Sequence, residues 1–533
     1  MVLASTQLTA NDGNLTGFPS STNGWSLLPE AFAHLGGDEC TALGGNVVGG
    51  ECQISSFQAK TSTAHGGSFD IWETLRIKGN GRIDASGGGI TINVSGDLIL
   101  ESPTVATGGQ IEANDPSSAS GASPITLNVS GNMEMQAGTV VEARNTVGAG
   151  NGATITITVT GDLTMAGASG STPGARIESS GVSLTSAGNL VFDVGGNMEM
   201  QAGSVVKAES GGYGKGGSIT IAVTGDLTLH GKIAGPPLVA GAIVSSSGAY
   251  LASAGNLVFD VGGNMEMQAG SVVKAESGGN GNGDDITITV TGNLTLGGEA
   301  IISSSVLGGT GGDAGDITVN VGNCTASPPT GDLVVDPGAK VQANTAKGAG
   351  GAIVMNACRH IKMDGLVESY SGRTGVPNQP PGGGTITLDA GCDLTVSDEG
   401  KVSSRGLDPG ADLVHLEGGC SVLIFGLVES TGPGHAVPIN PPNHCNSAYR
   451  PDKHPSSTTC VEVWAGDKLT IDSDAGEGHN GEVSADGGPG GRGWIDLFAR
   501  GDITIDGDAS GAFAAHANRA GGTDQVGGTV TVK

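Results

Sequence analysis

The sequence predicts an all-β protein, a parallel β-helix (β-solenoid) of about 14 coils. Residues 186–212 return letter for letter at residues 253–279, an offset of 67 residues that spans two repeats. Within each repeat, apolar and polar residues alternate with a period of two, which is typical of strands with one buried face. Many short strands of this kind bury their apolar faces only by stacking coil upon coil.

Fourteen copies of the repeat align on the first apolar residue of an ITIxVxG-like core. These anchors are Ile90, Ile125, Ile155, Leu190, Ile219, Leu257, Ile286, Ile317, Ile353, Ile386, Val414, Val461, Ile495 and Val530. Thirteen intervals cover 440 residues, with extremes of 28 and 47, and such variation belongs in loops. Corresponding strands of successive coils are expected to pair in parallel, about 4.8 Å apart.

A predicted corner follows each of the first seven anchors. Glycine stands six residues after the anchor, and the next residue is Asp or Asn. The column runs Asp97, Asn132, Asp162, Asn197, Asp226, Asn264 and Asn293. An unbroken Asp column would place like charges one coil apart, whereas alternation with Asn leaves an amide–carboxylate ladder. We interpret it as a turn column, not a binding site.

Composition excludes several classes of function. A formal net charge of −29 argues against nucleic acid and acidic lipid as partners. No segment approaches the length of a transmembrane helix, so membrane insertion is not expected. The 97 glycines among 533 residues argue against helices. No G-x-S-x-G, H-E-x-x-H or phosphate-loop motif supports an enzyme, and no catalytic residue is assigned.

Eight cysteines predict disulfides and hence an oxidising compartment. In sequence order they pair as Cys40/Cys52, Cys324/Cys358, Cys392/Cys420 and Cys445/Cys460. Cys392 and Cys420 each lie six residues past their anchor, so stacking brings them within disulfide range. Cys324 and Cys358 lie in adjacent coils at unequal offsets. A metal site is disfavoured because no C-x-x-C pair exists.

The chain divides into three regions. Residues 1–68 do not fit the repeat and are interpreted as an irregular N-terminal cap or docking segment, with Trp25 and Phe32 among its apolar residues. Residues 69–322 are regular coils. Residues 323–533 continue the solenoid with cysteines, prolines and loop insertions.

The final residues suggest a means of assembly. Val530 and Val532 are the first inward positions of a further coil. An open strand edge is a template for another chain, which predicts head-to-tail addition of further copies. A short edge strand protected by a loop is the alternative.

One acidic cluster is a candidate calcium site. Asp472, Asp474, Asp506 and Asp508 fall eleven and thirteen residues past their anchors in two neighbouring coils. Stacked carboxylates suit calcium, which prefers several oxygen ligands. Solvated turn acids are the stronger interpretation, and a polysaccharide-lyase-like site is a further alternative. No other cofactor is expected.

The segment Gly216–Gly231, GGSITIAVTGDLTLHG, resembles the repeats of filamentous-haemagglutinin-type bacterial surface exoproteins. The resemblance covers residues 69–533 and implies a right-handed parallel β-helix, export to the cell surface, and a structural or adhesive role. We therefore expect an extracellular filament subunit or adhesin, with copies of itself and surface carbohydrate or extracellular matrix as partners. A carbohydrate-active β-helix enzyme (lyase or hydrolase) and a monomeric surface adhesin are the alternatives.

Overall fold

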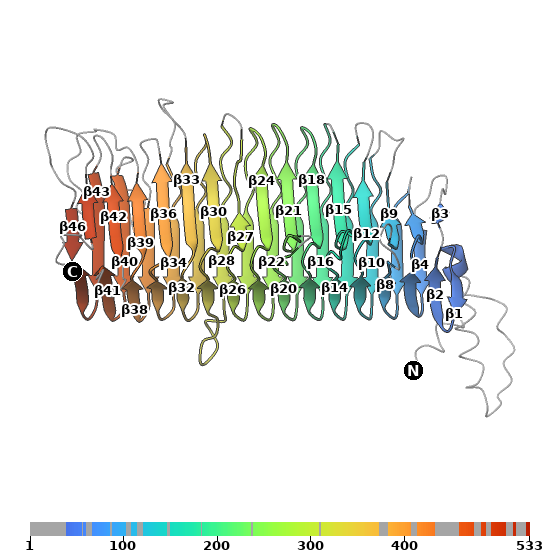
Figure 1. The fold of residues 1–533 in the computed structure, drawn as a ribbon, viewed down its shortest axis with the longest axis horizontal. Coiled ribbons are helices and arrows are strands. Elements are labelled where there is room, and N and C mark those ends of the chain that lie inside the picture. The colour runs from blue at the N-terminus through green and yellow to red at the C-terminus, as the bar shows by residue number, and fades with distance from the viewer. Residues whose placement is uncertain are drawn as a thin grey trace.

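The computed structural model forms a rod whose strands run across its long axis, with the early coils at one end and the late coils at the other (Figure 1). It describes residues 39–55, 57–59, 67–85, 88–102, 108–114, 121–145, 150–182, 184–235, 238–308, 311–372, 382–406, 413–431, 458–473, 481–486, 492–507, 515–518 and 529–532. A single helical turn at residues 39–42 precedes the first strand.

Three long sheets make up the walls of the described rod. Sheet I contains β1 (Asn46–Val48), β2 (Glu51–Ile54), β5 (Thr74–Ile77), β8 (Leu98–Leu100), β11 (Met133–Met135), β14 (Leu163–Met165), β17 (Met198–Met200), β20 (Leu227–Leu229), β23 (Met265–Met267), β26 (Leu294–Leu296), β29 (Leu333–Val335), β32 (Ile361–Met363), β35 (Leu394–Val396), β38 (Ser421–Ile424), β41 (Lys468–Ser473) and β44 (Ile503–Gly507). Sheet II contains β3 (Phe57–Ala59), β6 (Arg82–Asp84), β9 (Gln110–Glu112), β12 (Val140–Arg144), β15 (Arg176–Gly181), β18 (Val205–Ser210), β21 (Ile243–Gly248), β24 (Val272–Ser277), β27 (Ile301–Ser303), β30 (Lys340–Thr345), β33 (Leu366–Ser371), β36 (Lys401–Gly406), β39 (Leu427–Thr431), β42 (Glu482–Asp486) and β45 (Ala515–Asn518). Sheet III contains β4 (Gly67–Ile71), β7 (Ile90–Val94), β10 (Ile125–Val129), β13 (Ile155–Val159), β16 (Leu190–Val194), β19 (Ile219–Val223), β22 (Leu257–Val261), β25 (Ile286–Val290), β28 (Ile317–Val321), β31 (Ile353–Ala357), β34 (Ile386–Ala390), β37 (Leu413–Gly418), β40 (Thr458–Ala465), β43 (Arg492–Ala499) and β46 (Thr529–Val532).

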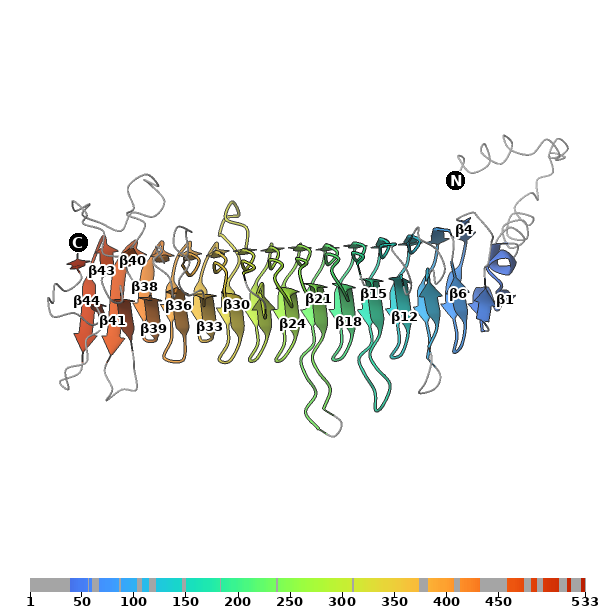
Figure 2. The ribbon, with the colours of Figure 1, turned by 90° about the horizontal axis from the view of Figure 1, so that it is seen from above.

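Each coil crosses sheet III, then sheet I, then sheet II, and returns to sheet III one level higher (Figure 2). All strand pairs are parallel except β1 with β2, which are antiparallel neighbours in the described chain. The protein is therefore a parallel β-helix, as predicted. Fifteen strands in sheet III leave fourteen spacings of about 4.8 Å, a stack about 67 Å long.

The register confirms the predicted stacking of the anchors. Leu190 pairs with Ile219, and Ile219 pairs with Leu257, so the letter-for-letter repeat spans two coils. All fourteen anchors form one unbroken column from β7 to β46. The period-two pattern determined this register, because a slip of one residue would turn every apolar side chain outward.

The interior is one continuous apolar cluster that runs the length of the described rod. In β17, Met198 and Met200 are buried, whereas Glu199 between them points outward. Neighbouring coils place Leu163 and Leu227 against Met198 in the same column. Full burial of such a side chain is worth about 1.5–3 kcal/mol, so the stacked columns supply most of the stability.

The parallel stack begins earlier than the sequence predicted. β2 pairs with β5, and β3 pairs with β6, so Glu51–Ile54 and Phe57–Ala59 already belong to the solenoid rather than to a cap. Cys52 and Ile54 of β2 point inward and are buried. This coil was missed because no anchor strand precedes it among the described residues, in which sheet III starts with β4 at Gly67.

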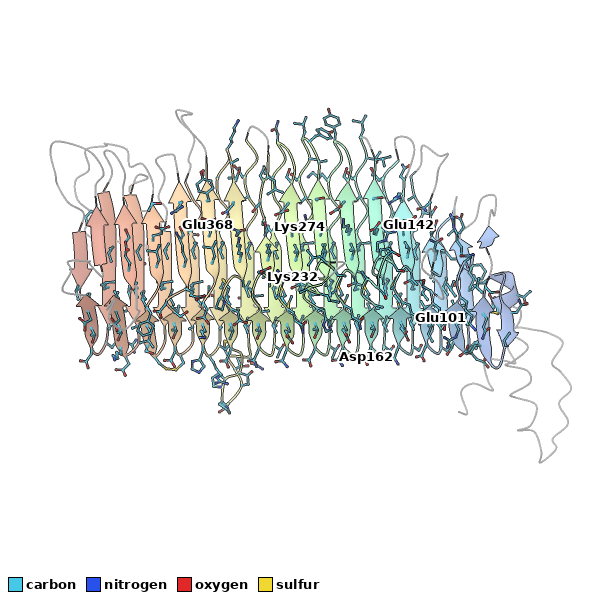
Figure 3. The ribbon with its side chains drawn as sticks, viewed as in Figure 1. Glu101, Glu142, Asp162, Lys232, Lys274 and Glu368 are labelled. Atoms are coloured by element: carbon cyan, nitrogen blue, oxygen red, sulfur yellow. A yellow bond between two sulfur atoms is a disulfide. The ribbon has the colours of Figure 1, made fainter. Side chains whose placement is uncertain are left out.

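The corner column between sheets III and I forms a hydrogen-bond ladder. The backbone N–H of Asp162 donates to Asn132 Oδ1 at 2.9 Å, and the N–H of Asn197 donates to Asp162 Oδ1 at 2.7 Å. Asp162 marks this corner in Figure 3. The predicted side-chain amide–carboxylate ladder is therefore mainly a ladder from backbone to side chain, in which Asp and Asn accept equally well.

This ladder also explains the glycine column. A Cβ atom added at Gly196 would overlap with Asp162 Oδ1 and lie 2.8 Å from the carbonyl carbon and oxygen of Gly161. The corner therefore has room for the acceptor of one coil only if the next coil carries glycine there.

Candidate functional site

The outer face of sheet II carries a row of polar and charged side chains. Glu142, Lys274 and Glu368 lie in one line along the rod (Figure 3), each at the central outward position of its strand. Because the strands stack in register, any ligand on this face meets the same position once per coil. A regular surface of this kind suits extended partners.

Some acids of this face belong to structural ion networks. Glu429 accepts a hydrogen bond from Ser403 Oγ at 2.7 Å and lies 2.9 Å from Lys401 Nζ and 3.0 Å from Arg405 Nε. Burial would raise its pKa, but these partners outweigh burial and lower the pKa of Glu429. Such a network holds neighbouring coils together.

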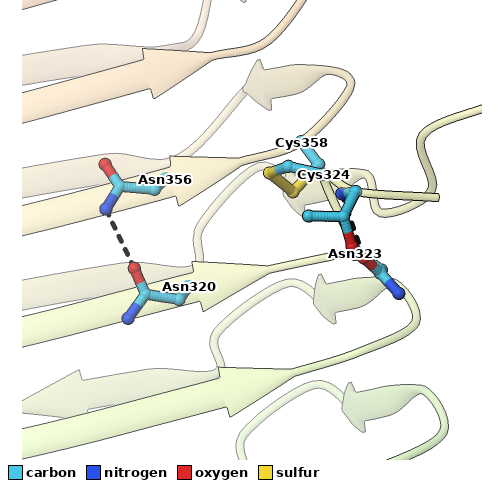
Figure 4. The surroundings of a disulfide bond; sticks show 6 residues. Asn320, Asn323, Cys324, Asn356 and Cys358 are labelled. Atoms are coloured by element: carbon cyan, nitrogen blue, oxygen red, sulfur yellow. Dashed lines mark hydrogen bonds between the residues drawn. A yellow bond between two sulfur atoms is a disulfide. The ribbon is translucent and has the colours of Figure 1, made fainter.

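Two disulfides join neighbouring coils. Cys392 and Cys420 are bonded with Cα atoms 4.4 Å apart, as expected for equivalent residues of stacked coils. Cys324 and Cys358, 4.9 Å apart, are joined beside the stacked pair Asn320 and Asn356, whose side chains hydrogen-bond at 2.9 Å (Figure 4).

The other cysteines lie toward the two ends of the chain. Cys40 and Cys52 are bonded at a Cα separation of 5.5 Å. Cys460 is buried and disulfide-bonded. Its predicted partner, Cys445, lies outside the described residues.

One group with metal-ligating side chains fails as a metal centre. His360, Cys392 and Asp393 lie close enough to share an ion. The Cys392 sulfur is bonded to Cys420, however, and a disulfide sulfur is not the thiolate that binds metals. His360 Nδ1 instead lies 3.3 Å from Asp393 Oδ2 at the surface.

The candidate calcium site is only half inside the described chain. Asp472 on β41 pairs directly with Asp506 on β44, so the predicted stacking of these two carboxylates is present. Asp474 and Asp508 lie outside the described residues. Calcium binding here stays a prediction.

A second cluster lies on the outer face of sheet III near its late end. His415 on β37 is the direct neighbour of Glu462 on β40. His415 Nδ1 lies 3.2 Å from Glu462 Oε2, and His415 Nε2 lies 3.5 Å from Glu417 Oε2. The side chains of Glu462 and His415 are 2% and 13% exposed, so this is a largely desolvated pair.

The electrostatics of this cluster favour a protonated histidine. Burial opposes the charge, but the hydrogen bond and charge of Glu462, helped by Glu417, outweigh burial and raise the pKa of His415 above its ordinary 6.5. Asp389 on β34 pairs with Glu417 on β37. Burial and the charge of Glu417 raise the pKa of Asp389. The cluster therefore favours the charged form of His415 more than water does.

Aromatic side chains adjoin this pair. Trp464 follows Glu417 in the outward column, and its ring lies 5.0 Å from that of Phe498 between centroids, at 37°. This cluster was not predicted from the sequence. The sequence does indicate that His415 and Glu462 are neighbours, because each stands one residue after its anchor. The 47-residue interval between those two anchors obscured this relation.

Two of the four residues that were predicted to take part in assembly lie in the described chain. β46 is the last described strand of sheet III, with Val530 opposite Ile495 and Val532 opposite Leu497. Val532 is 52% exposed. Trp25 and Phe32 lie outside the described residues, so their role in docking stays a prediction.

The chain has a partial likeness to one curated protein. It is similar to deoxyribonuclease CdiA of Dickeya dadantii (strain 3937), with 26% identity over 269 residues, which cover 47% of this chain. The chain spans only 7% of the length of that protein. No protein-family model and no solved structure matches the chain.

This likeness concerns the scaffold. Because stacked strands extend from Glu51 to Val532, most of the aligned residues lie within the solenoid. The fold agrees with the one that the resemblance to filamentous-haemagglutinin-type exoproteins implies. Nuclease activity belongs to the name of the relative and does not transfer with so short a match. Among the described residues, no helix is long and apolar enough to cross a membrane.

Proposed function

We propose that this chain is the rod of an exported surface fibre or adhesin, which displays its outer faces to other molecules. The observation that carries this proposal is the unbroken, in-register column of anchors from Ile90 to Val530. A stack of identical coils makes a stiff, extended surface.

The disulfides support an extracellular location. Three pairs are closed in the described chain, and its described cysteines include none that is free. Disulfides of this kind persist outside the reducing cytosol. Immunogold labelling of intact cells tests this part: gold along the cell surface supports export, and gold confined to the interior contradicts it.

Head-to-tail assembly is the finer part of the proposal. β46 is the last described strand of sheet III, and the exposed Val532 would be covered by the first coil of another copy. Electron microscopy of the purified chain at rising concentration should show fibres that Val532→Glu shortens. Val258→Glu, on the outer face of mid-rod β22, is the matched control and should leave fibres unchanged. Single rods at every concentration would contradict assembly without touching the surface location.

A carbohydrate-active enzyme is the second candidate, because a buried His–Glu pair adjoins exposed Trp464. Purified protein is incubated with neutral and acidic polysaccharides, and reducing ends are counted. Cleavage that is lost in Glu462→Gln would favour the enzyme. Equal numbers of reducing ends with and without the protein would exclude the enzyme.

A further inference from the structure

We propose that a groove across four neighbouring strands of sheet II binds a glycan that carries one carboxylated sugar. This inference rests on the proposed adhesive function and names its receptor chemistry. The groove has a volume of about 580 Å³ and lies across β12, β15, β18 and β21 in the middle of sheet II. Its charged lining comprises Arg144, Arg176, Glu178, Lys207 and Glu209.

The groove gathers positive charge in a strongly acidic chain. Three of the 24 Lys and Arg residues meet here, against 53 acids overall. Three cations and two carboxylates leave a local charge of +1. Acidic ligands are therefore attracted to this place, whereas the chain as a whole repels them.

The internal ion pairs of the groove leave donors available. Arg144 and Arg176 share one carboxylate, with nitrogen–oxygen distances of 3.8 and 3.6 Å to Glu178, both longer than hydrogen bonds. Arg176 Nε is buried and has no hydrogen-bond partner among the described residues, so it lies out of reach of a ligand. Guanidinium groups bind carboxylates in a two-pronged geometry, so a ligand carboxylate would instead meet the terminal nitrogens of the two arginines, which lie beyond hydrogen-bond distance of Glu178.

Two tyrosines lie in loops that follow strands of the groove. Tyr213 and Tyr250 come from the loops after β18 and β21, and Tyr213 follows the lining residue Gly211 by two positions. Their ring centroids are 5.5 Å apart at 25°, and the residues are 54% and 63% exposed. Exposed, stacked aromatic faces in a chain with four tyrosines mark a contact surface, and the apolar face of a sugar ring fits such a platform.

Charge and shape together select the ligand class. The carboxylates of Glu178 and Glu209 lie among the cations and would repel a densely charged polyanion. We place the single carboxylate of such a glycan at the guanidinium groups and its neutral sugar toward the tyrosines. The shared chemistry is an isolated acidic sugar, which sialic acid or a uronic acid can supply.

The letter-for-letter repeat provides a matched control. Lys207 and Lys274 are equivalent residues of the two copies, and each lies 3.5 Å from the Glu two positions later. Lys207 lines the groove, and Lys274 is not part of its lining. Lys207→Gln and Lys274→Gln therefore make the same local change, the first inside the groove and the second outside it.

The test is isothermal titration of the full chain with defined sugars. Sialyllactose is compared with lactose, and a glucuronic-acid-containing disaccharide with its glucose counterpart. Binding of either acidic sugar but not of its neutral counterpart is the expected result. Lys207→Gln and Tyr213→Ala should each weaken binding roughly tenfold, and Lys274→Gln less than twofold. Circular dichroism verifies that each variant is folded.

Three results would overturn the proposal. These are no binding of either acidic sugar, equal weakening by Lys207→Gln and Lys274→Gln, or tighter binding of a polysulfated glycan than of the single-carboxylate sugars. None of them alters surface labelling or fibre formation, so failure here is distinguishable from failure of the proposed fibre.

Discussion

Gly196→Ala perturbs the corner ladder at one known point. The new Cβ would overlap with Asp162 Oδ1, which accepts the backbone N–H of Asn197 at 2.7 Å. Loss of a hydrogen bond to a charged acceptor costs about 1.5–3 kcal/mol. The lower unfolded-state entropy of alanine returns about 0.4–1 kcal/mol. We expect a net loss of about 1–2 kcal/mol in the free energy of unfolding.

Gly278→Ala is the matched control. A Cβ atom there finds its nearest neighbour, the Gly248 carbonyl oxygen, at 3.8 Å, which is ordinary contact. Only the entropic gain remains, so this variant should be neutral or slightly stabilised. Urea unfolding followed by far-ultraviolet circular dichroism measures both variants. In a protein that already carries Asp162→Ala, Gly196→Ala should lower the free energy of unfolding by less than it does in the unmodified protein. Equal effects of the two single substitutions, or stabilisation by Gly196→Ala, would refute the role of the ladder.

Three further predictions follow from the core, the histidine pair and a disulfide. Leu190→Ala empties a fully buried position and should cost about 2–5 kcal/mol in urea unfolding, far more than an outward substitution in the same strand. The raised pKa of His415 means that its pairing with Glu462 adds stability that is fully present below pH 6.5 and lost as pH rises through the folded-state pKa. His415→Gln should therefore make the melting temperature depend less on pH in that window. A pH dependence equal to that of the unmodified protein would contradict the pairing. Replacing Cys392 and Cys420 by Ser opens a loop closed over 28 residues and should cost about 3.5 kcal/mol, whereas a shift no larger than that of a surface substitution would argue against the bond.

The sequence alone was sufficient to predict how the strands stack, but it was not sufficient to predict every candidate site. The anchors align by simple counting, because one inward face per strand allows only one register, and Leu190 therefore lies between its predicted neighbours. The same counting brought Cys392 to Cys420. This counting did not find the first coil, because the described part of the chain has no anchor strand before β2 and β3.

The groove could not be found in this way. Arg144 and Arg176 stand at opposite ends of their strands, and Lys207 stands at a third position. No single column of the alignment contains all three, so only the three-dimensional arrangement of neighbouring coils brings them together. The Tyr213 and Tyr250 rings likewise meet through loops of unequal length, which the strand period does not fix.

Cross-linking of paired cysteines tests the stacked register most directly. Thr220 on β19 lies opposite Val258 on β22, whereas Asp260 lies two residues further along the same strand. Adjacent outward positions are about 4.8 Å apart, within the range that a disulfide spans. Thr220→Cys with Val258→Cys should oxidise to a bond found by mass spectrometry of unreduced peptides, and Thr220→Cys with Asp260→Cys should remain reduced. The opposite outcome, or no bond in either pair, would contradict the solenoid on which the proposed fibre depends.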